Sequence, residues 1–297
     1  SSLFEDNAEY GYGMFQAVNT IRLRILKRME EIKADVSTEL SDLFTLFADN
    51  FYDGDKTTEI RDELVALMEK ENTENPNEKV KNNITEILEL KQYLIKKSIW
   101  MFGGDGWAYD IGFGGLDHVL ASGDDVNMLV LDTEVYSNTG GQASKSSPAG
   151  SVAKFASAGK PVKKKDLAAI SMTYGNIYVA RISMGANQNQ ALKAIREAEA
   201  YPGPSIIIAY SPCIAHGLKE GMGKSQTEEK LATEVGYWPI LRFDPRLAEK
   251  GKNPLQLDSK SPAWDKYEEF LKRERRYTTL LAEFPDHAKI LFEMNLK

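Results

Sequence analysis

The part of the chain after Lys97 alternates short apolar runs with stretches of helical character. The apolar runs lie at 99–102, 128–131, 177–183 and 206–210, and the helical stretches lie near 109–121, 166–174 and 188–201. Runs without a polar face, separated by helices, are typical of strands that are buried on both sides in a parallel sheet. We therefore predict an α/β fold in which helices cover both faces of a parallel sheet, with one more strand within 237–243.

The first hundred or so residues have a different pattern, in which apolar residues recur every three or four positions. Such spacing places them along one stripe of a helix. It predicts a long helix from about Met14 to Phe51, a second near 57–70, and a third after a polar break at 71–77. We expect an inserted helical segment at about 22–97. It is either a solvent-exposed insert that packs on the core or a segment that binds a partner protein.

Charge and composition exclude several classes of protein. The chain has 297 residues, of which 37 are basic and 44 acidic, for a net charge of −7. Nucleic acids and anionic membranes attract positive surfaces, so neither is expected as a partner. No apolar run reaches the roughly 20 residues of a membrane span, and we expect a cytoplasmic protein. The single cysteine, Cys213, excludes an internal disulfide. Because the chain lacks an initial Met, we also expect it to be a piece of a longer protein.

The sharpest motif is Gly103-Gly104-Asp105-Gly106, which follows a predicted strand and precedes a predicted helix. Glycines at such a turn let the backbone approach a ligand, and the start of a helix favours a phosphate. A carboxylate beside a diphosphate would be repelled unless a divalent cation lay between them. The turn therefore predicts a diphosphate that is bridged to Asp105 by Mg²⁺.

The end of the following strand offers the other half of such a site. The run 128–131 leads into a polar loop that contains Thr133 and Val135, and residues 107–132 leave room for a crossover helix and a strand. Mg²⁺ prefers octahedral oxygen coordination, which the Thr133 hydroxyl and the Val135 carbonyl can join from one side of the loop. We predict that these two oxygens and Asp105 bind Mg²⁺.

These motifs resemble those of a known family. A Gly-Asp-Gly turn followed at this distance by a polar metal ligand is similar to the thiamine diphosphate motif. The segments 103–112, 132–142 and 210–217 further resemble the pyruvate:ferredoxin (flavodoxin) oxidoreductases, and the similarity runs from Leu3 to about Phe243. Thiamine enzymes in general have asparagine at the position of Thr133, whereas threonine is expected within this oxidoreductase family.

The resemblance implies a thiamine diphosphate-binding domain over residues 1–250, with residues 251–297 as a C-terminal helical extension. It implies that Asp105 and Thr133 bind Mg²⁺ by their side chains and Val135 by its carbonyl, and that Gly104 and Gly106 flank the diphosphate.

The resemblance also implies a catalytic role for Asn138, which would face the 2-oxoacid substrate, and it makes Cys213 one ligand of a [4Fe-4S] cluster. Such a cluster needs four cysteines, so the other three must come from outside this chain. The glutamate that activates the thiamine aminopyrimidine would likewise belong to another domain.

The implied function is that of a 2-oxoacid oxidoreductase, which converts pyruvate and coenzyme A to acetyl-CoA and passes electrons through iron-sulfur clusters. The implied partners are the rest of the subunit, a second copy in a homodimer, and a ferredoxin or flavodoxin. Two alternatives stay open: an enzyme for another 2-oxoacid, and a non-catalytic module that kept the fold and binds a partner. Alone, the chain is expected to be incomplete and inactive.

The remaining polar motifs have simpler explanations. The three histidines lack zinc-binding spacing, and only His216 is expected near the chemistry. The basic runs 163–165 and 272–276 are expected to be solvated surfaces. The polar loop 140–147 is interpreted either as a flexible connection or as a flap beside the diphosphate.

Overall fold

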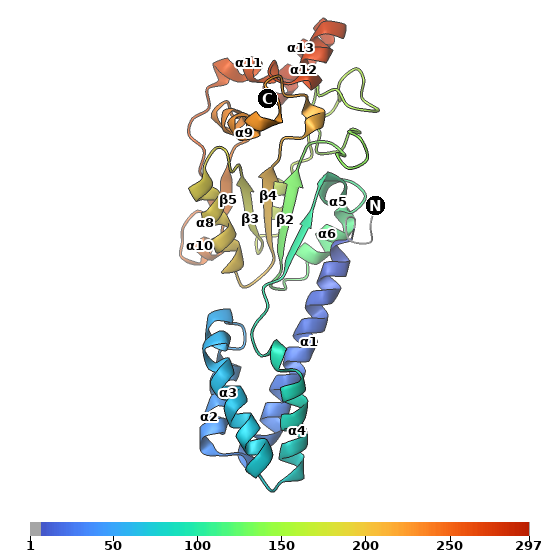
Figure 1. Ribbon diagram of the computed structural model, residues 1–297. Helices are drawn as coiled ribbons and strands as arrows, with labels where there is room; N and C mark the ends of the chain where they lie inside the picture. Colours follow the sequence, from blue (N-terminus) through green and yellow to red (C-terminus); the bar gives the residue numbers. More distant parts are fainter. Residues whose placement is uncertain (1–6, 297) are drawn as a thin grey trace. The chain divides into compact units, whose positions relative to one another are not determined.

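The computed structural model describes residues 7–296, which fall into two compact units. One unit contains the residues up to Gly11 together with those from Trp100 onward, and the other comprises Tyr12–Ile99 (Figure 1). The insert expected at about 22–97 lies within the second unit. In the described part of the chain, no helix is long and apolar enough to cross a membrane.

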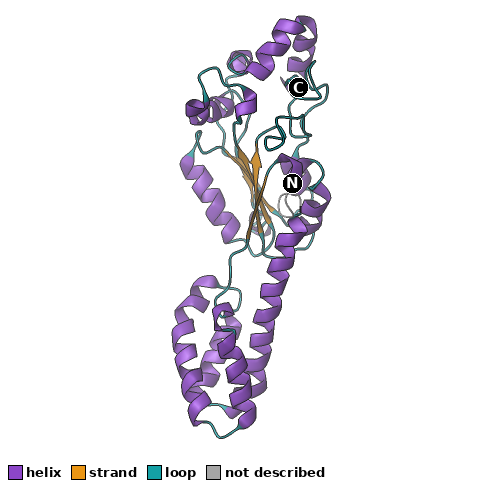
Figure 2. Ribbon diagram, turned by 45° about the vertical axis from the view of Figure 1, so that its right-hand side comes forward, coloured by secondary structure: helices purple, strands orange, loops and turns teal. Residues whose placement is uncertain are grey.

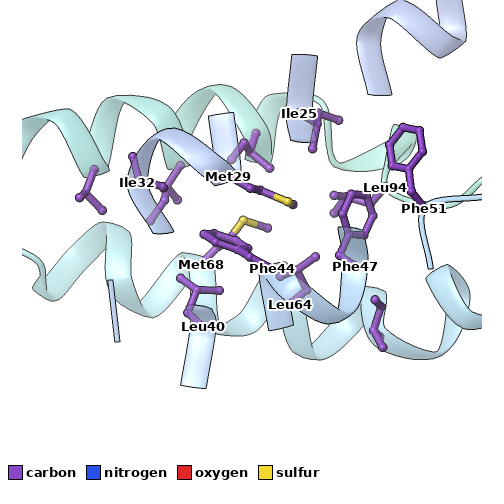
Figure 3. Close-up of a cluster of buried hydrophobic side chains, with 14 residues drawn as sticks. Ile25, Met29, Ile32, Leu40, Phe44, Phe47, Phe51, Leu64, Met68 and Leu94 are labelled. Carbon is purple, nitrogen blue, oxygen red and sulfur yellow. The ribbon is translucent and has the colours of Figure 1, made fainter. Parts of the chain in front are cut away.

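The helical unit buries a core of its own. Its elements are α1 (Ala8–Ile32), α2 (Thr38–Asp49), α3 (Gly54–Glu74) and α4 (Glu78–Glu89). Figure 3 shows the side chains that these helices bury together, which include Ile25, Met29, Phe44, Leu64 and Met68. Burial of one apolar stripe from each helix stabilises the unit, as the spacing of the apolar residues predicts.

The predicted single helix from Met14 to Phe51 is wrong. A 3₁₀ turn at Lys33–Asp35 and an extended Val36 separate α1 from α2. The backbone N–H of Ser37 donates a hydrogen bond to Glu71 on α3, 2.8 Å away, which ties the break to the neighbouring helix. Helical spacing continues across the break because both helices face the same core, and so the pattern of apolar residues does not reveal the interruption.

The other unit is built on a six-stranded sheet with the order β1-β2-β4-β3-β5-β6. The first four strands in this order are mutually parallel, which confirms the predicted α/β class. They are β1 (Trp100–Gly103), β2 (Asn127–Asp132), β4 (Ser205–Tyr210) and β3 (Tyr178–Ile182). Two short antiparallel strands, β5 (Leu241–Phe243) and β6 (Leu255–Leu257), extend the sheet beyond β3. The sequence did not predict β6, because two of its three residues are exposed and no buried run marks it.

Helices cover both faces of this sheet, which Figure 2 shows nearly edge-on. Helix α8 (Gln188–Glu199) packs its alanines against Tyr178, Ala180 and Ile207. Helix α5 (Asp105–Tyr109) packs against β2, and α7 (Leu167–Met172) packs against β3. The predicted helix at 109–121 corresponds to α6 (Phe113–Leu120), which begins after a break that separates it from α5. Between them, a Cβ at Gly112 would lie 2.6 Å from the Trp107 carbonyl oxygen, so the chain needs glycine there.

The C-terminal segment belongs to the same compact unit as the sheet. Besides β6, it contains α11 (Tyr267–Leu271), α12 (Arg275–Glu283) and α13 (Pro285–Leu296), and it follows α9 (Ser225–Glu234) and α10 (Arg246–Glu249). In Figure 1, α9, α11, α12 and α13 lie beyond the end of the sheet toward which β2 and β4 point. Ligands of parallel α/β sheets bind at this edge. The C-terminal segment therefore lies where a functional site is expected.

Candidate functional site

The Gly-Asp-Gly turn and the loop after β2 meet at the carboxyl edge of the sheet. Strand β1 ends at Gly103, Gly104 is extended, and Asp105 is the first residue of α5. Strand β2 pairs with β1 in parallel and ends at Asp132. Since neighbouring parallel strands end at the same edge, the turn and the loop are brought side by side.

Three oxygen-bearing groups converge there, as the sequence predicted. The Thr133 hydroxyl hydrogen-bonds to the Asp105 carboxylate and lies 3.0 Å from the Val135 carbonyl oxygen. The backbone N–H of Val135 also donates to Asp105, at 3.3 Å. The Ser137 hydroxyl lies 2.9 Å from that of Thr133 and adds a fourth oxygen.

Asp105 is the group in this cluster that needs a partner. Its side chain is buried, and its Oδ1 has no hydrogen-bond partner among the described residues. Burial and the nearby charge of Asp132 raise the pKa of the Asp105 carboxyl to about 8. A buried carboxylate with a free oxygen is costly unless a cation neutralises it.

The donor set fits a hard cation that completes its coordination with ligand oxygens. Among residues 7–296 there is no group of three or more His, Cys, Asp or Glu side chains that could hold a metal. Mg²⁺ is typically bound by one or two carboxylates together with waters and phosphate oxygens of the substrate. One carboxylate, one hydroxyl and one peptide carbonyl beside an open glycine turn match that kind of site.

The loop that carries these oxygens has an unusual backbone. Glu134 adopts a left-handed conformation with φ of 59°, which costs roughly 1 kcal/mol for a residue other than glycine. Its carboxylate is buried and accepts hydrogen bonds from Arg276 and Tyr237, each at 2.6 Å. Burial raises the pKa of the Glu134 carboxyl, but the charges of Lys164 and Arg276 outweigh burial and lower it to about 2.

The buried charges around the loop form ion pairs with one another, and Asp105 is not part of these pairs. Asp132 lies 2.6 Å from Lys164, and Glu274 accepts a 2.6 Å hydrogen bond from Arg276. Together with Glu134, these acids number three and pair with the two cations Lys164 and Arg276, while Nδ1 of His216 lies 3.7 Å from Glu274. Neither Lys164 nor Arg276 forms an ion pair with Asp105, which agrees with the unpaired Oδ1 of that carboxylate.

The turn that begins at Cys213 lies against the loop 133–137 after β2, which carries the predicted metal ligands and is called the metal loop. The Nε2 of His216 lies 2.7 Å from the carbonyl oxygen of Thr133, and because a carbonyl only accepts, Nε2 must carry the hydrogen. Cys213 precedes the 3₁₀ turn Ile214–His216, and its nearly buried sulfur accepts from the Ala215 N–H at 3.4 Å. A [4Fe-4S] cluster does not fit this chain by itself, because the chain has one cysteine.

Of the remaining predicted site residues, Gly106 is tightly packed, whereas Gly104 and Asn138 have space beside them for a ligand. A Cβ at Gly106 would lie 2.7 Å from the Tyr136 ring, so packing alone requires a glycine there. A Cβ at Gly104 would meet nothing closer than the Leu131 carbonyl oxygen at 3.9 Å, so the space beside Gly104 is open. Asn138 is exposed in the turn that follows the metal loop.

The polar loop after this turn is packed rather than open. Ser144, Ser146 and Ser147 are buried, and the Ser147 hydroxyl donates to the Glu134 carbonyl oxygen at 2.5 Å. The ammonium group of Lys160 donates to the carbonyl oxygens of Ser144 and Ser147, at 2.8 and 2.6 Å. The buried serines therefore pack against the metal loop, and their segment is not a flexible connection.

Three charged residues of this site were not predicted from the sequence. Lys164, Glu274 and Arg276 were expected on solvated surfaces, but their side chains are 21%, 0% and 1% exposed. Lys164 pairs with Asp132 and Arg276 with Glu134, and these acids lie far away in the sequence, so no local pattern reveals the pairing. The sequence did contain one signal for this pairing. Two acids, Asp132 and Glu134, lie at the end of a strand that is predicted to be buried, and buried acids require cations from elsewhere in the chain.

Comparison with known proteins identifies the kind of domain that contains these loops. The family described as thiamine pyrophosphate enzyme, C-terminal TPP binding domain, matches residues 88–209, a span that includes the Gly-Asp-Gly turn and the metal loop. The pyruvate:ferredoxin oxidoreductase of Moorella thermoacetica is 51% identical over 300 residues, which cover 98% of this chain and 25% of that protein. The pyruvate-flavodoxin oxidoreductase of Klebsiella pneumoniae is 49% identical over 293 residues, 98% of this chain and 24% of that protein.

A third relative has a different electron acceptor in its name. The mitochondrial pyruvate dehydrogenase [NADP(+)] of Euglena gracilis is 48% identical over 295 residues, which cover 98% of this chain and 16% of that protein. The chain thus spans about a quarter or less of the length of the relatives that it matches. Nearly all of it aligns with them at about half identity, and so the chain belongs to the pyruvate:ferredoxin (flavodoxin) oxidoreductase family and contains its thiamine diphosphate-binding domain.

Proposed function

We propose that this chain is the cofactor-binding part of an oxidoreductase that oxidatively decarboxylates pyruvate to acetyl-CoA and passes the electrons to iron-sulfur clusters. The observation that carries the proposal is the buried Asp105 carboxylate, whose free oxygen lies beside the Thr133 hydroxyl and the Val135 carbonyl. Pyruvate, rather than another 2-oxoacid, is favoured because each of the three relatives described above has pyruvate in its name.

In this proposal, Asp105, Thr133 and the Val135 carbonyl would hold Mg²⁺, and Gly104 and Gly106 would flank the diphosphate. The open space beside Gly104 supports this placement. Thiamine diphosphate, when bound, supplies the nucleophilic carbon and the electron sink that cleavage of a 2-oxoacid requires. The chain's own contribution is to fix the charged end of the cofactor at the edge of a rigid parallel sheet, so that the position of the reactive end is determined.

Asn138 would face the substrate from the exposed turn next to the metal loop. An amide side chain can donate hydrogen bonds to the carboxylate or keto oxygen of a 2-oxoacid. We expect Asn138→Ala to lower the rate of pyruvate oxidation by about tenfold to a hundredfold while cofactor binding is retained. Steady-state kinetics and calorimetry of the same preparation would separate these two effects.

Cys213 would provide one ligand of a [4Fe-4S] cluster, with the other three cysteines outside this chain. Its turn contacts the metal loop through His216, which supports a cluster close to the thiamine. The rest of a larger subunit, a second copy in a homodimer and an electron carrier such as ferredoxin or flavodoxin complete the proposed enzyme, which we place in the cytoplasm. The relatives' names give different electron acceptors, so the shared segment serves pyruvate chemistry rather than the choice of acceptor.

The test uses the full-length protein that carries this chain, purified without oxygen. Thiamine diphosphate and Mg²⁺ are titrated by calorimetry, and pyruvate-dependent and coenzyme A-dependent reduction of a viologen dye is measured beside other 2-oxoacids. The proposal expects cofactor binding and a preference for pyruvate. A protein that binds no thiamine diphosphate would instead be a non-catalytic module, and a higher kcat/KM for a different 2-oxoacid would overturn the substrate assignment.

A further inference from the structure

The left-handed conformation of Glu134 determines which way the proposed metal ligands point. Thr133 and Val135 flank Glu134, and with φ of 59° at Glu134 the Thr133 hydroxyl and the Val135 carbonyl oxygen come within 3.0 Å of each other. An extended residue at position 134 would send the chain on in the direction of β2 instead. Since the left-handed region is unfavourable for glutamate, something outside the loop has to hold it there.

Arg276, in the C-terminal segment, binds the Glu134 side chain and so stabilises this conformation. One terminal nitrogen of its guanidinium donates to Glu134, 142 positions earlier in the sequence, at 2.6 Å, and Nε donates to Glu274 at the same distance. The Tyr237 hydroxyl donates to the same Glu134 oxygen at 2.6 Å. All of these side chains except that of Tyr237 are fully buried, so the contacts are shielded from water.

The same segment also reaches the backbone of the metal loop on its other side. Glu274 lies 3.7 Å from Nδ1 of His216, whose Nε2 lies 2.7 Å from the Thr133 carbonyl oxygen. The backbone N–H of Arg275 donates to the Gly217 carbonyl oxygen at 3.0 Å, which fixes the turn that carries His216. Residues 274–276 therefore contact the loop through the Glu134 side chain and, by way of His216, through the Thr133 peptide.

We propose that Arg276, together with Glu274, is a positioning residue for cofactor binding: it holds Glu134 in its left-handed conformation, so that Thr133 and Val135 face Asp105. This inference rests on the proposed function, because it assumes that Mg²⁺ and the diphosphate bind at Asp105. It assigns the C-terminal segment a direct part in the cofactor site, although that segment lies beyond the matched thiamine-binding domain.

A second buried arginine makes a matched control. Arg242 is 6% exposed and pairs with Glu197 at 2.7 Å and with Asp258 at 2.8 Å. It bridges two acids as Arg276 does, but these acids lie on α8 and in the segment after β6. Arg242→Met should therefore lower stability as Arg276→Met does without touching the metal loop.

The experiment measures how much Mg²⁺ the full-length protein needs for half-maximal binding of thiamine diphosphate. We expect Arg276→Met to raise this concentration at least about tenfold, and Tyr237→Phe, which removes one hydrogen bond to Glu134, to raise it about threefold. Arg242→Met should leave it within about twofold of the wild-type value. An unchanged Mg²⁺ requirement in Arg276→Met would overturn the inference, as would an equal increase in Arg242→Met.

A double variant separates positioning from a general loss of packing. Glycine adopts a positive φ without help, so Glu134→Gly combined with Arg276→Met should recover most of the lost Mg²⁺ affinity, to within about threefold of wild type. Failure to recover would contradict the positioning role. If Arg276→Met yields no folded protein, Tyr237→Phe decides alone, and an unchanged Mg²⁺ requirement in that variant overturns the inference. Absence of binding in the wild-type protein would instead overturn the proposed function.

Discussion

The carboxylate of Asp105 and the hydroxyl of Thr133 hydrogen-bond to each other across the ends of β1 and β2, although 28 positions separate them. The contact joins the two loops that the sequence predicts as halves of one metal site. It uses only Oδ2 of Asp105, and the buried Oδ1 remains without a partner among the described residues. The two loops are thus in direct contact, and one buried carboxylate oxygen stays available for a ligand.

Asp105→Asn should abolish cofactor binding without unfolding the protein. An amide has nearly the same shape but no charge to balance Mg²⁺, so we expect the affinity for thiamine diphosphate with Mg²⁺ to fall by at least about a hundredfold. The free energy of unfolding without cofactor should stay the same or rise by about 1 kcal/mol, because a buried uncompensated carboxylate is removed. Calorimetry and urea unfolding measure the two quantities.

Asp117→Asn serves as the control for that variant. Asp117 lies on α6 and accepts a hydrogen bond from the Tyr174 hydroxyl at 2.8 Å, away from the Gly-Asp-Gly turn. Its substitution should leave cofactor binding unchanged. If Asp105→Asn bound the cofactor as tightly as Asp117→Asn does, Asp105 would not be a metal ligand.

Gly104→Ala tests where the diphosphate lies. No atom of the described chain comes within 3.9 Å of a Cβ at this position, so stability should change by no more than about 0.5 kcal/mol. A diphosphate packed against Gly104 would clash with the added methyl group, and we expect about tenfold weaker cofactor binding. Gly114→Ala is the matched control, because its Cβ meets no atom within 4 Å and it lies on α6. Equal affinities in the two variants would place the diphosphate elsewhere.

Met68→Ala should destabilise the helical unit alone. Met68 is fully buried in the core that α1 to α4 share. Removal of its side chain leaves a cavity, which typically costs about 2 to 5 kcal/mol. Hydrogen exchange should show weaker protection of the amides within Tyr12–Ile99 and unchanged protection of β2 and β4. Equal loss of protection in both units would show that they unfold together.

Lys160 should make the stability of the protein depend on pH in the alkaline range. Burial, with a smaller effect of the Lys164 charge, lowers the pKa of the Lys160 ammonium group to about 8. The unfolded chain keeps this proton up to about pH 10.5, so it binds more protons than the folded chain between pH 8 and 10.5, and stability should rise with pH there.

The measurement for Lys160 compares the wild-type protein with Lys160→Met, since other groups titrate equally in both. Relative to the variant, the wild-type free energy of unfolding should increase by roughly 1 to 2 kcal/mol from pH 8 to 10.5, a range that allows for partial solvent screening. A difference that stays constant over this range would mean that Lys160 keeps its ordinary pKa in the folded protein.

Cys213→Ser tests the proposed cluster ligand. In the full-length protein purified without oxygen, we expect iron content to fall by about one four-iron cluster per chain, with cofactor binding retained. Iron quantitation together with electron paramagnetic resonance of the reduced protein measures the loss. Unchanged iron content would make Cys213 an ordinary buried thiol.

The sequence alone determined the α/β class and the two halves of the candidate metal site. Buried parallel strands read as apolar runs without a polar face, and a Gly-Asp-Gly turn between strand and helix is a local signal. The positions of Asp105, Thr133 and Val135 at one sheet edge follow from that pattern, because adjacent parallel strands end together.

Only the tertiary structure decided where some elements begin and end and what surrounds those oxygens. The break between α1 and α2 leaves the apolar spacing intact, and strand β6 is too short and exposed to be seen in the sequence. The contact between Arg276 and Glu134 joins residues 142 positions apart, where a local pattern carries no information. A run of charged residues looks like a solvated surface until the chain folds, and which of its members are buried depends on where distant acids need a counter-ion.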